Sequence, residues 1–490
     1  MKSQAAIIGS GIAGIASALR LKAKGYKVDI FEQNDYTGGK LHSITKGEYR
    51  FDYGPSLFTM PHLVDELFGL FDIDPKEYFQ YTRKDTICNY FWEDGKRFQV
   101  NANTKTFIKE AALSFDEPEE HLEDYLKNTK TKYDLTSKLF LEKSLHKFDT
   151  YLSKDTLKAI FNVSKLHLDS SLNEVNKRYF DHPKLIQLFN RFATYNGSSP
   201  YKTPGIMSMI PHLEMNYGTF IPKYGMHDIS QSLTQLAKDV GISIHLNQKV
   251  DEIVYENNTA KALKINGDDK AFDLIVCNMD VYSAYNILLK KIKAPKRTLS
   301  QERSSSALIF YWGINKTFRE LDLHNILFTE DYEKEFDHLF NKKNFAEDPT
   351  VYINISSKEV KEDAQEGHEN WFVMVNAPTN CGQDWTAQTT YIREKVIAKI
   401  NKCLGSKIEN HIEVEHVVTP RDIEFATSSF QGSLYGTSSN NKFASFLRHP
   451  NFSSKLKNLY FCGGSVHPGG GIPLCLLSAK IVSDLVPQPQ

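Results

Sequence analysis

The N-terminal residues combine two hydrophobic patterns. Residues 5–8 form a short apolar run typical of a buried strand, and residues 12–21 have the spacing of a helix with small residues on one face. Residues 27–31 form a second strand pattern that ends at Glu32. The pattern predicts a strand–turn–helix–strand unit.

The same alternation of strand and helix patterns returns later in the chain. Residues 227–240 are helical in pattern, residues 242–246 and 250–253 are strand-like, and residues 273–277 form a buried strand that ends at the polar turn 278–280. At the C-terminus a last strand is expected at 458–462 and a helix at 474–485. These segments predict an α/β domain assembled from distant parts of the chain.

The two intervening regions differ from each other. Residues 100–210 contain few glycines and are helical in pattern, and Leu141, Leu145, Phe148 and Leu152 recur at helical spacing. Residues 305–440 carry apolar or alternating runs at 307–312, 351–355 and 371–375, which predict a mixed sheet. From residues alone, the helical run is either an ordinary packed helix or one that dips into a membrane leaflet. The sheet either has an ordinary core or lines a cavity for an apolar ligand.

Residues 9–14 have the sequence G-x-G-x-x-G between the first strand and the first helix. Gly9 permits the tight turn, Gly11 a close approach to a pyrophosphate, and Gly14 close packing of helix on strand. The helix N-terminus offers unpaired N–H groups to phosphate, and Glu32 can accept hydrogen bonds from ribose hydroxyls. The order of strand, helix, second strand and acid predicts a dinucleotide site.

A second glycine-rich turn lies near the C-terminus, where residues 463–473 read GGSVHPGGGIP between the last strand and the last helix. So many glycines are conformationally costly, and the cost indicates a backbone that passes close to a large group. Gly38, Gly39 and Lys40 follow the N-terminal unit, with Lys40 as a cation near the diphosphate or ribose.

Composition and charge exclude several classes of protein. The 490 residues include 59 Lys and Arg against 60 Asp and Glu, a net charge of −1 that argues against a nucleic-acid binder. The six cysteines form no C-x-x-C pair and no His-rich cluster, so we expect no metal site and a reducing compartment. An apolar run long enough to span a membrane is missing, and the glycine-punctuated N-terminus is interpreted as folded structure.

Three motifs together resemble the bacterial carotenoid desaturases of the phytoene desaturase type. These are residues 9–14, the segment GTFIPKYGM at 218–226 and the segment VHPGGGIP at 466–473. Gly463, Gly464, Ser465 and Val466 before His467 look more like the branch that desaturates 1-hydroxycarotenoids at the 3,4 position. The resemblance implies an α/β fold with a Rossmann-like FAD-binding domain of the flavin amine oxidase and carotenoid desaturase type. A mixed-sheet substrate domain and a helical, membrane-associating part complete the expected fold.

The resemblance also implies how the chain is divided. Residues 1–100, 215–290 and 441–490 would form a discontinuous FAD domain, residues 101–214 a helical region that contacts the membrane, and residues 291–440 the substrate domain. The FAD-binding residues would be Gly9, Gly11, Ile12, Ala13, Gly14, Glu32, Gly39, Lys40, Ser56, Leu57, Val250, Asn278, Gly463, Gly464, Gly471, Ile472 and Pro473.

The implied reaction removes a hydride and a proton from a carotenoid to make a double bond, with the flavin as hydride acceptor and oxygen or a quinone as the final acceptor. A hydroxylated substrate would need a polar partner near the closed end of the tunnel. His467 and Asp149 are candidates for proton handling, each also explained as a structural side chain. Phytoene desaturase, carotene isomerase, another flavin oxidoreductase or a non-catalytic carotenoid carrier remain alternatives.

The implied location is the cytoplasm, peripherally on the inner face of the cell membrane. The basic run at 290–297 offers contacts to anionic lipids, although such a run is more often a solvated turn.

Overall fold

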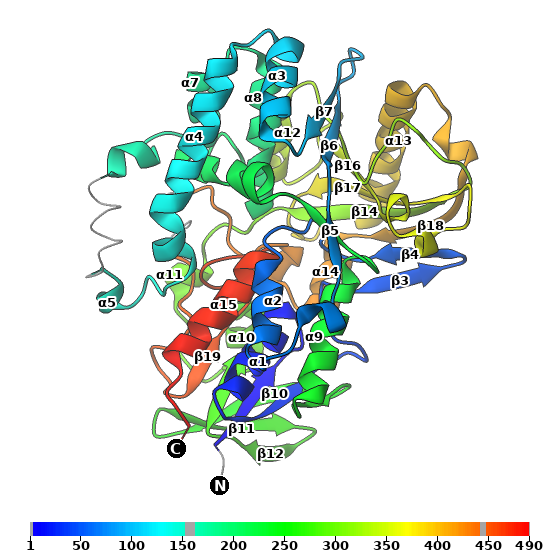
Figure 1. Cartoon of the computed structure of the whole chain (residues 1–490). Coiled ribbons are helices and arrows are strands. Elements are labelled where there is room, and N and C mark those ends of the chain that lie inside the picture. Colours follow the sequence, from blue (N-terminus) through cyan, green and yellow to red (C-terminus); the bar gives the residue numbers. More distant parts are fainter. Residues whose placement is uncertain (1–2, 152–161, 442–446, 490) are drawn as a thin grey trace.

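The computed structural model describes residues 3–151, 162–441 and 447–489. A five-stranded sheet near the two termini has the order β19-β13-β1-β2-β9, and all its pairings are parallel (Figure 1). Its strands are β1 (Gln4–Ile8), β2 (Lys27–Phe31), β9 (Ser243–His245), β13 (Leu274–Cys277) and β19 (Leu459–Phe461). The sequence therefore predicted every strand of this sheet to within one or two residues.

The parallel sheet is covered on both faces, as the continuous apolar runs of its strands require. Ala5 and Ile7 of β1 point toward a core shared with α1 (Ile12–Ala23), α9 (His227–Asp239) and α15 (Ile472–Leu485). Ala6 and Ile8 point to the other face, which packs under the antiparallel sheet of β10 (Val250–Glu256), β11 (Thr259–Ile265) and β12 (Asp268–Ala271).

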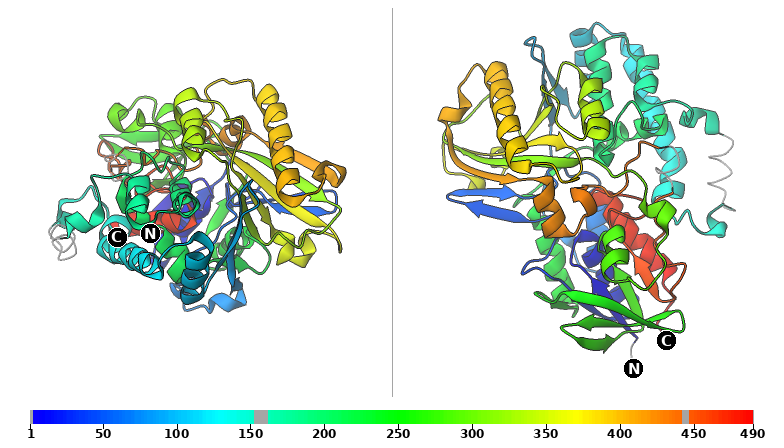
Figure 2. Two further views of the ribbon diagram at one scale, coloured as in Figure 1. Left: turned by 90° about the horizontal axis from the view of Figure 1, so that it is seen from above. Right: turned by 180° about the vertical axis from the view of Figure 1, so that it is seen from behind.

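A seven-stranded mixed sheet forms the second layer, with the order β18-β14-β17-β16-β15-β6-β7. Its strands are β6 (Thr86–Phe91), β7 (Arg97–Asn101), β14 (Ser306–Ile314), β15 (His324–Leu327), β16 (Val351–Ile355), β17 (Glu369–Ala377) and β18 (Ile412–Val418). Helix α13 (Trp385–Leu404) covers one face of this sheet, and the other face looks toward the parallel-sheet layer (Figure 2). The strand-rich character expected for residues 305–440 is therefore confirmed.

Helices α3 (Thr104–Phe115), α4 (Glu119–Thr136), α7 (Leu172–Tyr179) and α8 (Pro183–Asn190) gather at the far end from the termini (Figure 1). They share an aromatic-rich core with β6 and β7. Shorter elements are α2 (His62–Gly69), α5 (Phe148–Tyr151), α10 (Val281–Ile287), α11 (Lys296–Leu299), α12 (Tyr332–Asp337), α14 (Pro420–Thr427), the hairpin β3 (Ser43–Lys46) and β4 (Tyr49–Asp52), and the pair β5 (Tyr81–Arg83) and β8 (Phe220–Pro222).

The continuous helix indicated by the spacing of residues 141–152 is wrong. A helical segment ends at Leu141, residues 142–147 form a loop, and Leu152 lies outside the described residues. Thr150 Oγ1 of α5 donates to the Ser144 carbonyl at 2.7 Å, which ties the short helix back to the loop before it. Leu145 is buried in a small cluster with Leu139.

The expected boundary at residue 100 falls inside β7, and β6 and β7 pair within the seven-stranded sheet. Strand β6 is buried from Ile87 to Phe91 and needs a neighbour on each edge, which β7 and β15 supply. No helix among the residues described above is long and apolar enough to cross a membrane.

Candidate active site

The carboxyl edge of the parallel sheet brings the sequence motifs together. Gly9 follows β1, Glu32 follows β2, Asn278 follows β13 and Gly463 lies just after β19. Because the strands are parallel and adjacent, their carboxyl ends meet at one edge, where open α/β sheets bind their ligands. Backbone bonds fix the turns there, with Gly9 N–H donating to the Phe31 carbonyl at 2.8 Å.

These turns open into one continuous cavity of about 500 Å³. Almost all the predicted cofactor residues line it: Gly9, Gly11, Ile12, Ala13, Glu32, Gly39, Lys40, Ser56, Leu57, Val250, Asn278, Gly463, Gly464, Gly471, Ile472 and Pro473. The exception is Gly14. The residues 9–14, 32, 278 and 463–473 are called the cofactor wall below.

Gly14 acts through packing behind the cavity surface. A Cβ placed on Gly14 would lie 2.1 Å from the Gly9 carbonyl oxygen, closer than any real Cβ contact. Only glycine therefore allows α1 to start so close to β1. Gly11 at the N-cap has no side chain to bond the first turn, so the helix N-terminus faces the cavity with its positive dipole end.

Glu32 fixes the shape of the first glycine turn. Its Oε2 accepts from the Ser10 N–H and from the Ser10 hydroxyl, both at 2.8 Å, and its Oε1 accepts from the Asn34 N–H at 3.0 Å. The carboxylate is 6% exposed and still lines the cavity. It therefore orders the loop and leaves acceptor capacity toward a ligand.

Asn278 ties the same loop to β13. In the amide orientation that satisfies its neighbours, its side-chain oxygen accepts from the N–H groups of Gly14 at 3.2 Å and Gly11 at 3.3 Å. A Cβ on Gly11 would lie 2.8 Å from this amide, and one on Gly463 would lie 2.6 Å from it. Asn278 therefore sits at the centre of the cofactor wall, between both glycine-rich turns.

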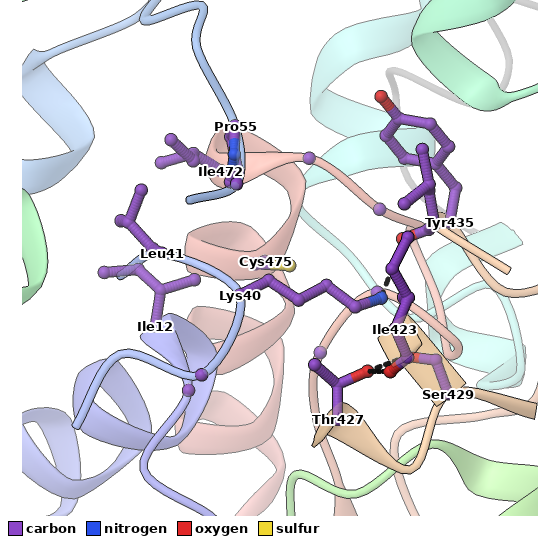
Figure 3. Close-up of a pocket in the computed structure, with 18 of the residues that line it drawn as sticks. Ile12, Lys40, Leu41, Pro55, Ile423, Thr427, Ser429, Tyr435, Ile472 and Cys475 are labelled. Carbon is purple, nitrogen blue, oxygen red and sulfur yellow. Dashed lines mark hydrogen bonds between the residues drawn. The ribbon is translucent and has the colours of Figure 1, made fainter. Parts of the chain in front are cut away.

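Lys40 reaches across the cavity wall toward the segment that carries Tyr435 (Figure 3). Its Nζ donates to the carbonyl oxygens of Ser433 at 3.3 Å and Leu434 at 3.1 Å. Burial lowers the pKa of Lys40, against the opposing charge of Asp280. The cation expected near the diphosphate or ribose is thus bonded to the 433–434 backbone.

The C-terminal glycine turn ends at Gly471, which has φ of 101° and is followed at once by α15. Residues that carry a side chain rarely adopt this backbone conformation, so glycine is required where the turn enters the helix. Ile472 and Pro473 line the cavity at the start of α15, and Figure 3 labels Ile472 there.

Neither candidate for proton handling is placed in the cavity. His467 is 3% exposed, does not line the cavity, and donates from Nε2 to the Lys143 carbonyl at 2.9 Å. Burial lowers the pKa of His467 to about 4, so the ring is neutral near neutral pH. The side chain of Asp149 lies outside the described residues.

The cavity continues beyond the cofactor wall into an inner chamber lined by the mixed sheet, which was one of the two alternatives that the sequence left open. We use this name for the part lined by Ser56, Ile87, Cys88, Arg191, Thr194, Tyr195, Glu214, Ala307, Ile309, His324, Ile326, Phe328, Tyr352, Phe372 and Met374. Further residues missed beside the cofactor wall are Gln33, Asn34, Gln248, Lys249, Met279 and Asp280. The polar turn predicted at 278–280 was a signal for the last two. The runs at 307–312, 351–355 and 371–375 indicated the sheet, but not which of their side chains face the cavity.

Strand register gathers the chamber side chains on one face of the mixed sheet. Ile309 pairs with Met374, which pairs with Tyr352, which in turn pairs with Ile326. Residues two apart along a strand share a face, so His324 joins this surface. The opposite face packs under α13, which leaves this face to the cavity.

One buried ion pair lines the chamber beside its apolar and uncharged polar side chains. Arg191 NH2 donates to Glu214 Oε2 at 2.6 Å, and both side chains are less than a tenth exposed. Burial raises the pKa of Glu214, and the charge of Arg191 opposes that rise. Among the described parts of the chain no group of three or more His, Cys, Asp or Glu residues is arranged to hold a metal ion.

The cavity fits a dinucleotide beside an apolar substrate. It joins a helix N-terminus whose N-cap residue is glycine, a carboxylate after the second strand and two glycine turns to a chamber walled mainly by apolar side chains.

Comparisons with known proteins agree with this geometry. The chain is 57% identical, over 99% of each chain, to a 1-hydroxycarotenoid 3,4-desaturase of Flavobacterium sp. (strain P99-3). It is 31% identical to a 4,4'-diapolycopene oxygenase of Methylomonas sp., over 98% of this chain and 97% of the relative. A solved oxidoreductase from Methanosarcina mazei shares the fold with a TM-score of 0.62 at 15% identity, over 98% of this chain and 100% of that chain.

The family described as flavin containing amine oxidoreductase matches residues 12–487, which is nearly the whole chain. This chain belongs to the flavin-containing amine oxidoreductase family.

Proposed function

We propose that this protein is an FAD-dependent desaturase that introduces the 3,4 double bond into a 1-hydroxycarotenoid. The observation that carries the proposal is the full-length 57% identity to a desaturase of that specificity. The continuity of the cofactor wall with an apolar chamber supports it, because the reaction needs a flavin and a long apolar chain in one enclosure. The cofactor is FAD, since the family is flavin-containing and the turns have the geometry for a dinucleotide.

Making the double bond removes a hydride and a proton from neighbouring carbons. When bound, the flavin supplies the hydride acceptor, and its electrons pass on to oxygen or a quinone. The task of the chain is to hold the polyene against the cofactor wall and to exclude water. Ala307, Ile309, Phe372 and Met374 present apolar surface from β14 and β17 for this purpose.

The proposed cofactor contacts follow from the cofactor wall. The N-terminus of α1 at Ile12 and Ala13 would bind the pyrophosphate, and Glu32 the ribose. Val250, beside Glu32 in the same cavity, would face the adenine. Gly471 and Ile472 would lie against the flavin ring.

We place the protein at a membrane surface, because the substrate is a lipid. Phe425 is 90% exposed and precedes Ala426 and Thr427, which line the cavity. Ile287 also lines the cavity, is partly exposed, and stands just before the basic run 290–297. An exposed apolar side chain and a basic run, each next to residues that line the cavity, suit an anionic lipid surface.

The decisive experiment supplies the purified flavoprotein with a 1-hydroxycarotenoid in liposomes. We expect a product that has lost two hydrogen atoms by mass and absorbs at longer wavelength. Unchanged mass with altered absorbance would indicate an isomerase, and a gain of oxygen an oxygenase. A flavin that stays oxidised with substrate under anaerobic conditions would indicate a non-catalytic carrier.

A further inference from the structure

The inner chamber has a polar end that the apolar part of the substrate does not need. His324, Tyr352 and Ser56 form a hydrogen-bonded chain there: Tyr352 Oη lies 2.8 Å from His324 Nδ1 and 2.8 Å from Ser56 Oγ. The Arg191–Glu214 pair lines the same chamber. Buried polar groups are costly in an apolar cavity unless they are paired, so each unpaired atom here requires an explanation.

His324 carries one such unpaired atom. The side chain is 3% exposed and lines the chamber, and its Nε2 has no hydrogen-bond partner in the described residues. Arg191 carries a second, because its Nε is also buried without a partner while its NH2 binds Glu214. Both residues border the same enclosed space.

The neighbours of His324 determine which of its two ring nitrogens carries the proton. Asn354 Nδ2 donates to the Leu323 carbonyl at 3.0 Å, which fixes the orientation of that amide. The same Nδ2 lies 3.3 Å from His324 Nδ1, so Nδ1 acts as an acceptor. A neutral ring whose Nδ1 accepts carries its proton on Nε2. Burial, and then the charges of Arg191 and Lys84, lower the pKa of His324 to about 3, so the ring is neutral.

The unpaired atoms are therefore two buried N–H donors on side chains that line a space for an apolar substrate. An alcohol oxygen accepts two hydrogen bonds, and a hydrocarbon end accepts none. We propose that His324 Nε2 and Arg191 Nε bind the terminal hydroxyl of the carotenoid and so determine that the substrate is hydroxylated. This inference rests on the proposed function and assigns its specificity to named side chains.

The proposal requires the pair to stand close to the cofactor wall. In a 1-hydroxycarotenoid a single carbon separates the carbon that bears the hydroxyl from the nearer carbon of the 3,4 bond. A group that binds the hydroxyl must therefore stand close to the flavin. Ser56, which the resemblance places among the cofactor residues, is connected to His324 through Tyr352 alone, and all three line the same cavity as the cofactor wall.

The test measures kcat/KM for a 1-hydroxycarotenoid and for the same carotenoid without the hydroxyl, in wild type and His324→Phe. Wild type is expected to prefer the hydroxylated substrate. In His324→Phe we expect kcat/KM for the hydroxylated substrate to fall at least about tenfold, with that for the deoxy analogue unchanged or raised. Equal losses on both substrates, or an unchanged ratio, would overturn the assignment.

A matched control and a second variant complete the design. His212 is also buried with an unpaired ring nitrogen, but it lies outside the cavity, so His212→Phe is expected to leave the ratio of the two substrates unchanged. If His324→Phe does not retain flavin, His324→Gln decides. This variant keeps an N–H donor, so its ratio should lie nearer to wild type than that of His324→Ala, which has none; equal ratios in the two variants again overturn the assignment.

The two levels of the argument fail separately. A flavin-loaded wild type that desaturates neither substrate would overturn the proposed function. A wild type that desaturates both equally well would leave desaturation standing and overturn only the hydroxyl site.

Discussion

The cofactor wall presents mainly backbone to the cavity, whereas the inner chamber presents side chains. Gly9, Gly11 and Gly471 contribute turns whose geometry excludes a Cβ or requires a positive φ. His324 and Arg191 instead project from a strand and a helical segment that are distant in sequence. The difference teaches that binding of the dinucleotide depends on chain geometry, while choice of substrate depends on a few replaceable side chains.

The largest expected effect tests whether the chamber side chains are coupled. Glu214→Leu leaves the Arg191 charge buried and unpaired, so we expect it to lower the free energy of unfolding by about 3–5 kcal/mol. The double variant Arg191→Leu/Glu214→Leu should regain most of that loss, because neither charge remains. Denaturant unfolding of the single and double variants measures the coupling.

The exposed pair Lys130–Asp134 is the control for this cycle. Both of its side chains are more than half exposed, and breaking it should cost less than about 1 kcal/mol. Additive losses at Arg191 and Glu214 would contradict the view that the chamber holds a single interacting pair.

The second effect tests the cofactor wall. Gly14→Ala forces a methyl group against the Gly9 carbonyl, which belongs to the backbone and cannot rotate away. We expect a loss of about 1–3 kcal/mol and weaker retention of flavin, read from thermal unfolding and visible absorbance.

Gly69 offers the matched control, since it closes helix α2 and a Cβ there meets nothing within 4 Å. Gly69→Ala should leave flavin content and stability near the wild-type values. Full flavin content in Gly14→Ala would show that the close approach of α1 to β1 is not needed.

The same difference between the cofactor wall and the inner chamber determines what could be predicted from the sequence. The glycine turns and the five parallel strands were found because each is specified by neighbouring residues, as in 9–14 and 463–473. His324 and Tyr352 were missed because they meet only through strand register, with Tyr352 opposite Ile326 and His324 two residues before it. Helical spacing at residues 141–152 misled because a loop intervenes, held in part by the bond from Thr150 to Ser144.

The third effect asks whether a side chain within the cofactor wall has a chemical role. His467 has a folded-state pKa of about 4, caused first by burial and then opposed by its bond to Lys143, against about 6.5 in an unfolded chain. Between those values the unfolded chain binds a proton and the folded chain does not, so this residue makes stability fall as the pH falls. His467→Gln should reduce that slope by up to about 1.4 kcal/mol per pH unit.

Two measurements separate the structural role of His467 from a chemical one. The unfolding free energy of wild type and His467→Gln is compared at a series of pH values from about 6.5 down to about 4. The pH profile of kcat should coincide in the two proteins, because His467 does not line the cavity. A shifted kcat profile would make His467 a participant in proton transfer.

The smallest effect concerns an exposed side chain next to residues that line the cavity. Phe425→Ser removes an apolar side chain that is 90% exposed next to the residues lining the cavity, and partial burial of such a ring in a lipid surface is worth about 1 kcal/mol. The affinity for anionic vesicles, measured by co-sedimentation, should therefore weaken about fivefold. Leu113 of α3 is 89% exposed but does not line the cavity, so Leu113→Ser should bind vesicles as wild type does. If Leu113→Ser weakens binding and Phe425→Ser does not, the helical layer contacts the lipid, and substrate must reach the chamber from another side.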